Sequence, residues 1–581
     1  MNTPRLSGLA GLLFVTLSAE LRAAPQGAIS RVSLSYQGSE PNLNCWRPDV
    51  SDDGRFVTFI SGATDLVPID SNGQWDVFVR DMQLGLTTRV SVSSSGAEAN
   101  GHSELARMSR DGRFVAFNSG ASNLVSGDSN GVADIFVHDR LTAATERVSV
   151  DSNGLQANGA SGLSDVSSTG RYVVFASAAA NLVAGDTNQH IDIFVRDRLA
   201  GTTVRASLRS GGGEPSGESL DASISADGRF VVFSSTSNDL VAGDTNGSED
   251  VFVRDMQLGT TSRVSVSTAG GEGNAASFRG TISNDGRLIA FTSIASNLVA
   301  GDTNDTRDVF VHDRSTGQTR RVSVGSTGAQ GNGQSFAARI SGHGGFVAFL
   351  SDASTLVSGD TNGVRDGFVH ELGAGLTTRF TVGGAGQQGN GEAGLEVWSS
   401  ISSDGRWVSF ASAASNLVAG DTNGWADAFT LDRAWFEPWS YCTGGTTTNA
   451  CTAQVSASAL PSVSGANACM LSVTNVEGQK SGLIFYSVAG ALIQPWSATS
   501  TSLLCVKTPT QRSPTQNSGG TAGACDGGFA LDWNAFQAAN PGALGNPWSA
   551  GDKLFAQAWF RDPPASKSTN LSNAIELTYQ P

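Results

Sequence analysis

A short acidic loop recurs along this chain and holds the residues best suited to chemistry. Its clearest copy, SNLVAGDTNDTRDVFVHDR at residues 296–314, places Asp302, Asn304 and Asp308 in an Asp-x-Asn-x-x-x-Asp pattern. Calcium prefers several oxygen ligands on a tightly turned loop, and this pattern supplies carboxylate and amide oxygens. The candidate calcium ligands in the seven copies are Asp70, Asn72, Asp76, Asp128, Asn130, Asp134, Asp186, Asn188, Asp192, Asp244, Asn246, Asp250, Asp302, Asn304, Asp308, Asp360, Asn362, Asp366, Asp421, Asn423 and Asp427.

The same residues allow an interpretation without a metal. Asp and Asn side chains hydrogen-bond to nearby backbone in turns and tolerate left-handed conformations. The pattern is similar to the calcium loops of integrin-type propellers, but it is shorter and lacks their acid at the fifth position. A calcium loop and a self-bonded turn therefore both remain open at this point.

Two further residue types keep the same interval as the loop. A Glu or Gln recurs at Glu40, Glu98, Gln156, Glu214, Glu272, Gln330 and Gln388. An arginine recurs at Arg89, Arg147, Arg205, Arg263, Arg321 and Arg379. Each arginine lies near Asp81 or its equivalent, so we expect a structural ion pair or hydrogen bond between them in each blade, with a binding role as the alternative.

The interval itself identifies a repeat protein. The glycine of a DGR-type turn lies at Gly54, Gly112, Gly170, Gly228, Gly286, Gly344 and Gly405, which gives a spacing of 58 residues five times and then 61. Seven registered copies of one supersecondary unit predict an array in which each unit buries its apolar faces against its neighbours.

Each copy contains four strand-like segments separated by Gly, Asn and Asp turn signals. Runs such as FVAF, YVVF and LIAF are apolar at successive residues, which is typical of strands covered on both faces. Four short strands in a unit repeated radially describe a β-propeller blade. The fourth strand is expected to end at RVSV, but the seventh copy lacks this segment. SRVSL at residues 30–34 supplies it, so the N-terminal strand should close the ring.

These repeats resemble the WD40-like (PD40) propeller repeat of TolB and related proteins. The segment ISADGRFVVFSS followed by DVFVRD carries the resemblance, which covers residues 29–433. It implies a scaffold and leaves the activity open. The chain departs from TolB in having seven copies, a longer acidic loop and no preceding α/β domain.

Residues 434–581 have a different composition and form a second predicted domain, a small β-sandwich with one short helix at DWNAFQAAN. The segments NVEGQKSGLIFYS and LCVKTPTQR resemble a domain found at the C-terminus of various exported bacterial proteins. Proximity suggests disulfides between Cys442 and Cys451 and between Cys505 and Cys525, with Cys45 and Cys469 free or bridged. Sequence alone does not fix this connectivity.

The first 24 residues predict a signal peptide, because Arg5 precedes an apolar run too short to span a bilayer. We therefore expect a secreted, periplasmic or cell-surface protein without a membrane span, and a monomer. The formal charge of −16 argues against nucleic acid as a partner, since that binding needs clustered Lys and Arg.

The function predicted from these features is that of an exported, non-catalytic propeller whose loop-rich face binds a protein or a carbohydrate. Calcium is the one candidate cofactor. The alternatives are an extracellular polysaccharide hydrolase or lyase and a purely structural surface component. Trp46 and Trp398 could stack on a sugar ring or serve packing, and no pair of acids stands out from the repeat. Unpaired carboxylates near the central channel would favour the enzyme.

Overall fold

The structure is a computed structural model that describes residues 29–580 except 385, 395–398, 436–438, 443, 464–468, 498–501, 550 and 564–567. The predicted signal peptide and Trp398 lie outside the described residues. Of residues 163 and 164 only the backbone is described. Within the described residues, no helix is long and apolar enough to cross a membrane.

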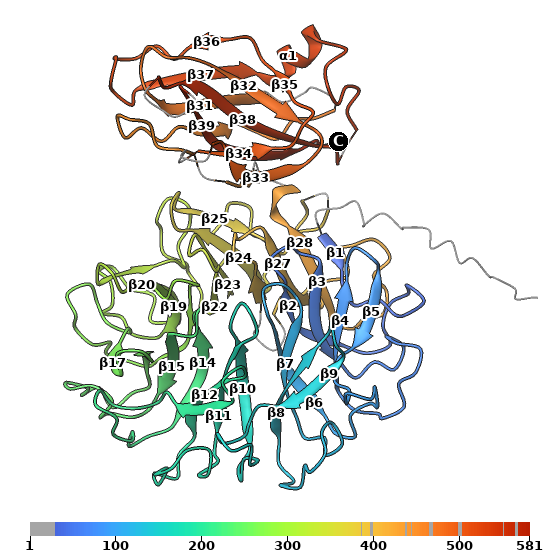
Figure 1. Ribbon diagram of the computed structural model, residues 1–581, viewed down its shortest axis with the longest axis vertical. Helices are drawn as coiled ribbons and strands as arrows, with labels where there is room; N and C mark the ends of the chain where they lie inside the picture. Colours follow the sequence, from blue (N-terminus) through green and yellow to red (C-terminus); the bar gives the residue numbers. More distant parts are fainter. Residues whose placement is uncertain are drawn as a thin grey trace, which may run out of the picture.

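Seven four-stranded antiparallel sheets form the blades of a propeller, as predicted (Figure 1). Blade 1 consists of β2 (Cys45–Val50), β3 (Phe56–Ser61), β4 (Asp76–Asp81) and β5 (Leu86–Arg89). Blade 2 consists of β6 (Ser103–Met108), β7 (Phe114–Ser119), β8 (Asp134–Asp139) and β9 (Ala144–Arg147). Blade 3 consists of β10 (Ser161–Val166), β11 (Tyr172–Ser177), β12 (Asp192–Asp197) and β13 (Thr202–Arg205).

The next three blades keep the same order from the inner to the outer strand. Blade 4 consists of β14 (Ser219–Ile224), β15 (Phe230–Ser235), β16 (Asp250–Asp255) and β17 (Thr260–Arg263). Blade 5 consists of β18 (Ser277–Ile282), β19 (Leu288–Ser293), β20 (Asp308–Asp313) and β21 (Gln318–Arg321). Blade 6 consists of β22 (Ser335–Ile340), β23 (Phe346–Ser351), β24 (Asp366–Glu371) and β25 (Leu376–Arg379).

The seventh blade is completed from the other end of the chain, which confirms the predicted seam. It contains β26 (Ser399–Ile401), β27 (Trp407–Ser412) and β28 (Asp427–Asp432), with β1 (Ile29–Arg31) as the outer strand. β1 pairs antiparallel with β28, so that Ile29 lies opposite Leu431. The ring is therefore closed by backbone hydrogen bonds between segments about 400 residues apart.

The fourth strand of each blade ends three residues earlier than the predicted RVSV boundary. In blade 4 it ends at Arg263, although the amide of Val264 still donates to Val251 O at 2.8 Å. The chain then turns across to the next blade, since Val266 forms an isolated bridge with Glu272. The valines of this segment thus pack at the root of the interblade loop.

The two middle strands of each blade are buried on both faces, as their continuous apolar runs predicted. β3 and β4 are almost entirely buried, and Phe59 and Phe78 stack between them with ring centroids 5.7 Å apart. Ile60 and Val79 of blade 1 pack in one cluster with Phe117 of blade 2. Neighbouring blades therefore share their cores, which is why no blade can be shielded alone.

The DGR-type turns pack edge to edge around the ring. Gly112 has a φ of +74°, and a Cβ there would lie 2.4 Å from the Phe56 ring of the preceding blade. The guanidinium group of Arg140 covers the other part of that ring at 4.1 Å and donates to Gly112 O. A glycine is required because the turn needs both a left-handed backbone and space for the aromatic ring.

The C-terminal part contains two packed sheets and one helix, as predicted. One sheet has β29 (Trp439–Ser440), β39 (Thr569–Thr578), β38 (Lys553–Arg561), β32 (Ser481–Ser487), β35 (Gln511–Arg512) and β36 (Gln516–Asn517). The other has β30 (Gln454–Ala457), β31 (Met470–Val476) and β37 (Gly527–Asp532), and a separate hairpin has β33 (Ala491–Pro495) and β34 (Leu503–Val506). Helix α1 (Trp533–Ala539) begins at Asp532, whose carboxylate accepts from the amide of Ala535. A short 3₁₀ helix, η1 (Arg433–Trp435), connects the propeller to this part.

The disulfide pairing predicted from proximity is wrong. The bonds join Cys442 to Cys505 and Cys451 to Cys525, while Cys45 and Cys469 are buried free thiols. Sequence distance misled the prediction because the sandwich brings residues more than 60 positions apart into contact.

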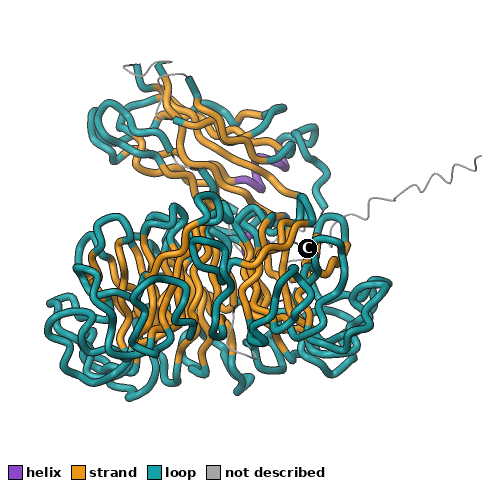
Figure 2. The backbone as a smooth tube through the Cα atoms, turned by 60° about the horizontal axis from the view of Figure 1, so that its bottom comes forward, coloured by secondary structure: helices purple, strands orange, loops and turns teal. Residues whose placement is uncertain are grey.

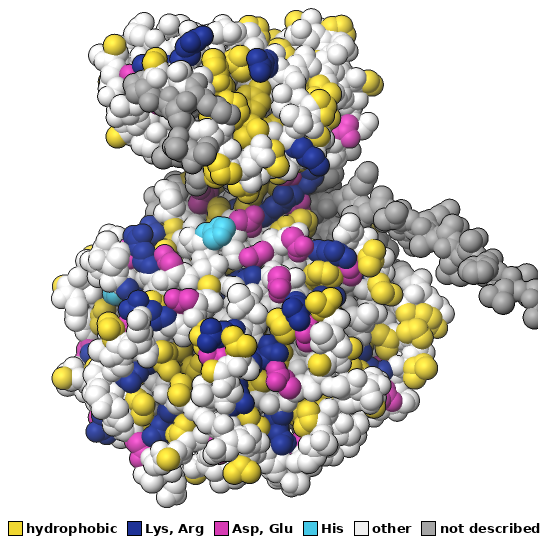
Figure 3. All heavy atoms as spheres, in the orientation of Figure 1, with side chains coloured by type: hydrophobic (Ala, Val, Ile, Leu, Met, Phe, Trp, Pro, Cys, Tyr) yellow, Lys and Arg dark blue, Asp and Glu magenta, His cyan; other side chains and the backbone are white. Residues whose placement is uncertain are grey.

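The C-terminal sheets lie over one face of the ring (Figure 2). Arg406, in the DGR turn of blade 7, donates to both carboxylate oxygens of Glu576 at 2.9 and 3.0 Å. Lys553 also reaches Glu576 at 2.7 Å, and Trp439 stacks on Phe346 of blade 6 at 5.8 Å. Acidic and basic side chains meet at this junction in Figure 3. The contacts involve the short turns of blades 6 and 7, so the face that carries the long loops lies on the opposite side.

Candidate functional site

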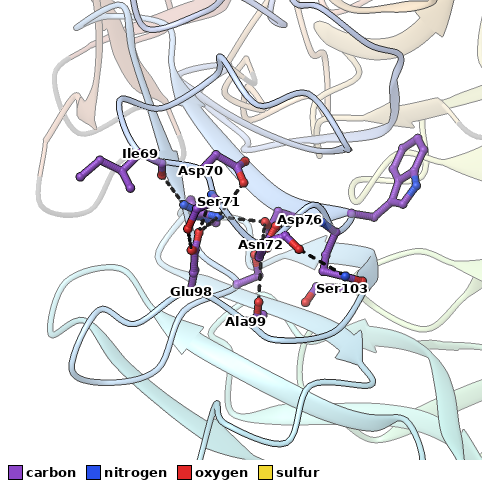
Figure 4. A network of polar contacts seen from close by, with 12 residues as sticks. Ile69, Asp70, Ser71, Asn72, Asp76, Glu98, Ala99 and Ser103 are labelled. Atoms are coloured by element: carbon purple, nitrogen blue, oxygen red, sulfur yellow. Dashed lines mark hydrogen bonds and ion pairs between the residues drawn. The ribbon is translucent and has the colours of Figure 1, made fainter.

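The acidic loops lie where the repeat predicted, between the second and third strands of each blade and next to the loop that joins successive blades. In blade 1, Arg89 from the outer strand contacts three carboxylates, those of Asp70, Asp76 and Glu98. These three acids are labelled in the network of polar contacts in Figure 4. The Nη1 atom of Arg89 lies 3.3 Å from Asp70, 3.0 Å from Asp76 and 2.8 Å from Glu98. Arg89 therefore holds a positive charge at the centre of the predicted ligand set.

The same arrangement recurs around the ring. The arginine Nη1 lies 2.8–3.4 Å from two carboxylates and one Glu or Gln oxygen in blades 2, 3, 4 and 6. In blade 5, Arg321 contacts Asp302 at 3.1 Å and Asp308 at 3.3 Å, while Gln330 donates to Asp302. These clusters of a loop arginine with its carboxylates are called arginine cages below.

The cage of blade 7 is assembled across the seam. Arg31 of β1 contacts Glu40 at 2.8 Å, Asp421 at 3.0 Å and Asp427 at 3.4 Å. One oxygen from each of these acids lies within 4.8 Å of the others, so their spacing alone resembles a metal site. The guanidinium group of Arg31 takes up this place, and it joins the N-terminal strand to the last blade.

The partner predicted for the loop arginines is wrong. Asp81 instead binds Arg55 of the DGR turn, with the Arg55 Nη2 atom 2.8 Å from the carboxylate. The register explains the difference, because Arg89 lies opposite Phe78 and three residues away from the end of the strand where Asp81 lies. Arg89 therefore reaches the loop end of the blade, and Asp81 remains at the turn end.

The Asn residue of each loop forms a self-bonded turn. Asn72 accepts from the amide of Gln74 at 2.8 Å and donates to Asp76 at 2.7 Å and to Ala99 O at 3.0 Å. The bond from Gln74 occupies the amide oxygen, which is the Asn72 atom that calcium would coordinate. Calcium requires oxygens at 2.3–2.6 Å around a vacant centre, and a guanidinium group lies at that centre. The donor set does not fit a calcium ion while the arginine is in place. Calcium binding stays a prediction that this geometry disfavours.

The cages carry more negative than positive charge, which affects the titration of their carboxyls. Burial, with repulsion from Asp250 and Glu272, raises the pKa of Asp244 to about 6 despite Arg263. Burial likewise raises the pKa of Asp427 to about 6. Hydrogen bonds from Thr187 lower the pKa of Glu214 to about 2, with Arg205 adding to the effect. The protonated form is thus favoured at Asp244 and Asp427, and the ionised form is favoured at Glu214.

These shifts predict a dependence of stability on pH. A carboxyl whose folded pKa lies above its unfolded value gains its proton first in the folded state, so it adds stability as the pH falls through the folded pKa. We expect the thermal unfolding midpoint to rise between pH 7 and pH 5, because Asp244 and Asp427 titrate near 6. Asp244→Asn should show a smaller rise. A midpoint that falls over this range, or an unchanged slope in the variant, would contradict the assignment.

The central channel gathers charges that do not follow the repeat. Each inner strand from blade 1 to blade 6 contains a β-bulge. Arg47, Asp221 and Arg279 lie in the bulges of three of these strands and have left-handed φ values of 53°, 52° and 56°. Non-glycine residues in this region are strained, and such strain concentrates at functional sites. The bulge re-aims the inner strand at the channel.

Two cavities of about 50 Å³ each lie along the channel. The one nearer the loop face is lined by Arg47, Arg107, Asp221, Arg279 and Arg339 among its charged residues. The one nearer the turns adds Asp49, Arg110 and Asp165. Five arginines and three aspartates therefore line the channel of a protein whose formal charge is −16.

Two carboxyls at the loop side of the channel have raised pKa values. Burial raises the pKa of Glu249 to about 7, with Asp221 adding repulsion and Arg279 opposing it. Burial also raises the pKa of Asp221. In blade 1, Trp46 stacks on Trp75 with centroids 4.7 Å apart, so one face of Trp46 is taken up by packing. Asp221 lines the loop-side cavity, and shifted carboxyls in such a place are candidates for a functional site.

The sequence reading missed these channel residues, although a signal was present. Residues 47, 105, 163, 221, 279 and 337 lie 58 apart and are Arg, Leu, Leu, Asp, Arg and Ala. These equivalent positions form a column of the aligned repeats. When the residue type varies in one column while the adjacent columns repeat, the blade fold does not require a particular side chain there. The expectation that no pair of acids stands out from the repeat missed Asp221 and Glu249, which lie in such columns.

No protein-family model and no curated protein matches the chain, whereas many solved structures do. TolB from Acinetobacter baumannii is similar at 15% identity and a TM-score of 0.33, over 58% of this chain and 63% of that one, so less than two thirds of that protein is spanned. Oligogalacturonate lyase in complex with manganese matches at 12% identity and 0.41, over 70% and 92%. An acylaminoacyl peptidase of Pyrococcus horikoshii matches at 11% and 0.39, over 75% and 59%. At these identities the likeness concerns the fold alone.

Proposed function

We propose that this protein is an exported, non-catalytic propeller that binds a protein or carbohydrate ligand at the loop-side mouth of its central channel. The observation that carries the proposal is that the periodic and the non-periodic charged residues lie in different places. The periodic acids are paired with the arginines of the cages, whereas the non-periodic Arg47, Asp221 and Arg279 line one cavity. The rigid cages would hold the loop rim around this mouth, and the cavity would receive the ligand.

Two further features support the proposal. The C-terminal sheets contact the turns of blades 6 and 7 through Arg406 and Phe346, so these contacts do not involve the long loops. The two disulfides suit an oxidising compartment outside the cytosol, in agreement with the predicted signal peptide.

A channel-blocking substitution tests the binding site. Leu105 lines the loop-side cavity and is only half-buried, so Leu105→Trp should fill the channel mouth without disturbing a blade core. On arrays of glycans and extracellular proteins, we expect the wild type to bind a ligand that Leu105→Trp loses. Leu199→Trp, at an outer turn where Leu199 is 79% exposed, is the matched control. Equal binding by all three proteins would reject the channel as the site.

The polysaccharide hydrolase or lyase is the second candidate, and Glu249 is the observation that favours it. A carboxyl with a pKa of about 7 has the proton affinity that suits general acid–base catalysis at neutral pH. Asp221 lies close enough to repel Glu249, and Arg279 attracts it, so two carboxyls and one arginine gather beside the channel. Release of new reducing ends from a bound saccharide would replace the binding proposal with this one.

A further inference from the structure

Two carboxylates of the channel bond to the neighbouring blades. Asp49 accepts from the amide of Met108 at 2.9 Å and from the hydroxyl of Ser400. Asp165 accepts from the hydroxyl of Ser223 at 2.9 Å and from an amide of the next blade. These two carboxylates therefore link neighbouring blades, and their hydrogen-bonding capacity is largely used by the ring itself.

Arginines outnumber acids among the residues that line the loop-side cavity. Arg47, Arg107, Arg279 and Arg339 line it, whereas Asp221 is its one acidic lining residue among those described. Burial lowers the pKa of Arg107 even though Asp49 and Asp165 favour its charge. Burial raises the pKa of Asp221, which favours its neutral form and reduces the negative charge in the cavity. The cavity thus concentrates positive charge in a poorly solvated place, where charge interactions are strong.

Hydrogen bonds join neighbouring turns at the turn end of the channel, on the side where the C-terminal sheets contact the ring. The amide of Asp52 donates to Arg110 O at 2.9 Å, and the amide of Asn284 donates to Gly342 O at 2.8 Å. The amide of Ser403 donates to the Asp52 carboxylate at 2.7 Å, which continues the ring of bonds. A ligand is therefore expected to enter from the loop face.

The size of the cavity restricts what enters. A volume of about 50 Å³ exceeds what one water molecule needs, but it is far below the 300–1,000 Å³ typical of a pocket that encloses a whole ligand. It suits one small charged group. Guanidinium groups bind planar or tetrahedral oxyanions through paired hydrogen bonds.

We propose that the loop-side cavity binds an oxyanion group, a carboxylate, sulfate or phosphate, carried by a ligand whose remainder rests on the loop face. This inference rests on the proposed function and specifies the chemistry of the same site. Arg279 and Arg339 are the residues expected to contact the oxyanion, because they line the cavity from adjacent blades.

Calorimetry with small probes tests the inference. The probes are sodium glucuronate, sulfate and phosphate at constant ionic strength, with glucose as the neutral counterpart of glucuronate. We expect the wild type to bind glucuronate or one of the inorganic oxyanions and not glucose. Arg279→Gln and Arg339→Gln should each weaken binding at least tenfold, and Arg279→Lys should restore part of it. Arg287→Gln, at an exposed turn pair with Asp313, should leave the affinity unchanged.

The outcomes separate this inference from the proposed function. Absence of oxyanion binding to the wild type, or full affinity in both glutamine variants, would overturn the oxyanion site. A neutral ligand found on the arrays that Leu105→Trp blocks and Arg279→Gln does not would keep the channel as a binding site and reject its oxyanion chemistry. Unfolding midpoints of all variants identify any loss that comes from misfolding.

Discussion

Arg263→Ala is expected to lower the free energy of unfolding by about 3–5 kcal/mol, the range for breaking a buried ion pair by removing one partner. Arg263 is 8% exposed and lies within 3.3 Å of Asp244, Asp250 and Glu272. Its loss leaves these acids without a countercharge, two of them almost fully buried. Chemical denaturation followed by tryptophan fluorescence would measure the change.

Arg287→Ala is the matched control in the neighbouring blade. It removes an arginine that also pairs with an aspartate, at 2.6 Å, but the Arg287 side chain is 52% exposed. Exposed ion pairs contribute little to stability, so the midpoint should scarcely move. Similar losses in both variants would show that the cage is no more important than a surface pair.

The same variant distinguishes an arginine cage from a calcium loop. Wild-type protein should unfold at the same temperature in millimolar calcium and in chelator, because Arg263 occupies the centre of the donor set. Arg263→Ala should gain stability with calcium, since three acids then surround a vacant centre and a ligand of the folded state raises its stability. A calcium-dependent midpoint in the wild type would instead restore calcium as a native ligand.

The repeat made the fold predictable, since its regular features are requirements of the blade. Gly112 must be glycine to accept the Phe56 ring, so the DGR turn appears at every interval. The missing outer strand of the seventh copy likewise indicated the seam with β1. The periodic residues are those that every blade requires for folding. In this chain they predict the strands, the turns and the closure of the ring.

The site was less predictable because it depends on side-chain direction and on departures from the repeat. Asp81 and Asp76 flank the same strand, and only the register of β5 shows that Arg89 reaches Asp76. Arg279 lies at a repeat position whose residues differ in charge. Its left-handed backbone conformation in the bulge cannot be predicted from local residue propensity. The predicted disulfide pairing was wrong for a related reason, because the fold of the sandwich, and not the sequence spacing, decides which cysteines lie close together.

Deleting residues 29–35 is expected to abolish cooperative folding of the propeller, whereas a protein that begins at residue 29 should fold normally. The deletion removes β1, so β28 becomes an exposed edge and loses the bond from the amide of Val32 to Ala428 O at 2.7 Å. It also removes Arg31 and the hydroxyl of Ser33, which donates to Asp427 at 2.6 Å. Asp427 is fully buried and would lose its countercharge.

The closing strand β1 should also stabilise the propeller when it is added as a separate peptide. A peptide of residues 27–36 added to the deleted protein is expected to restore a single unfolding transition, because edge strands accept a matching strand through main-chain hydrogen bonds. The same peptide with Arg31→Ala should restore less, since the cage across the seam needs the guanidinium group. Calorimetric scans of the three mixtures would measure this. If the deleted protein already unfolds at the midpoint of the protein that begins at residue 29, ring closure by β1 does not stabilise this fold.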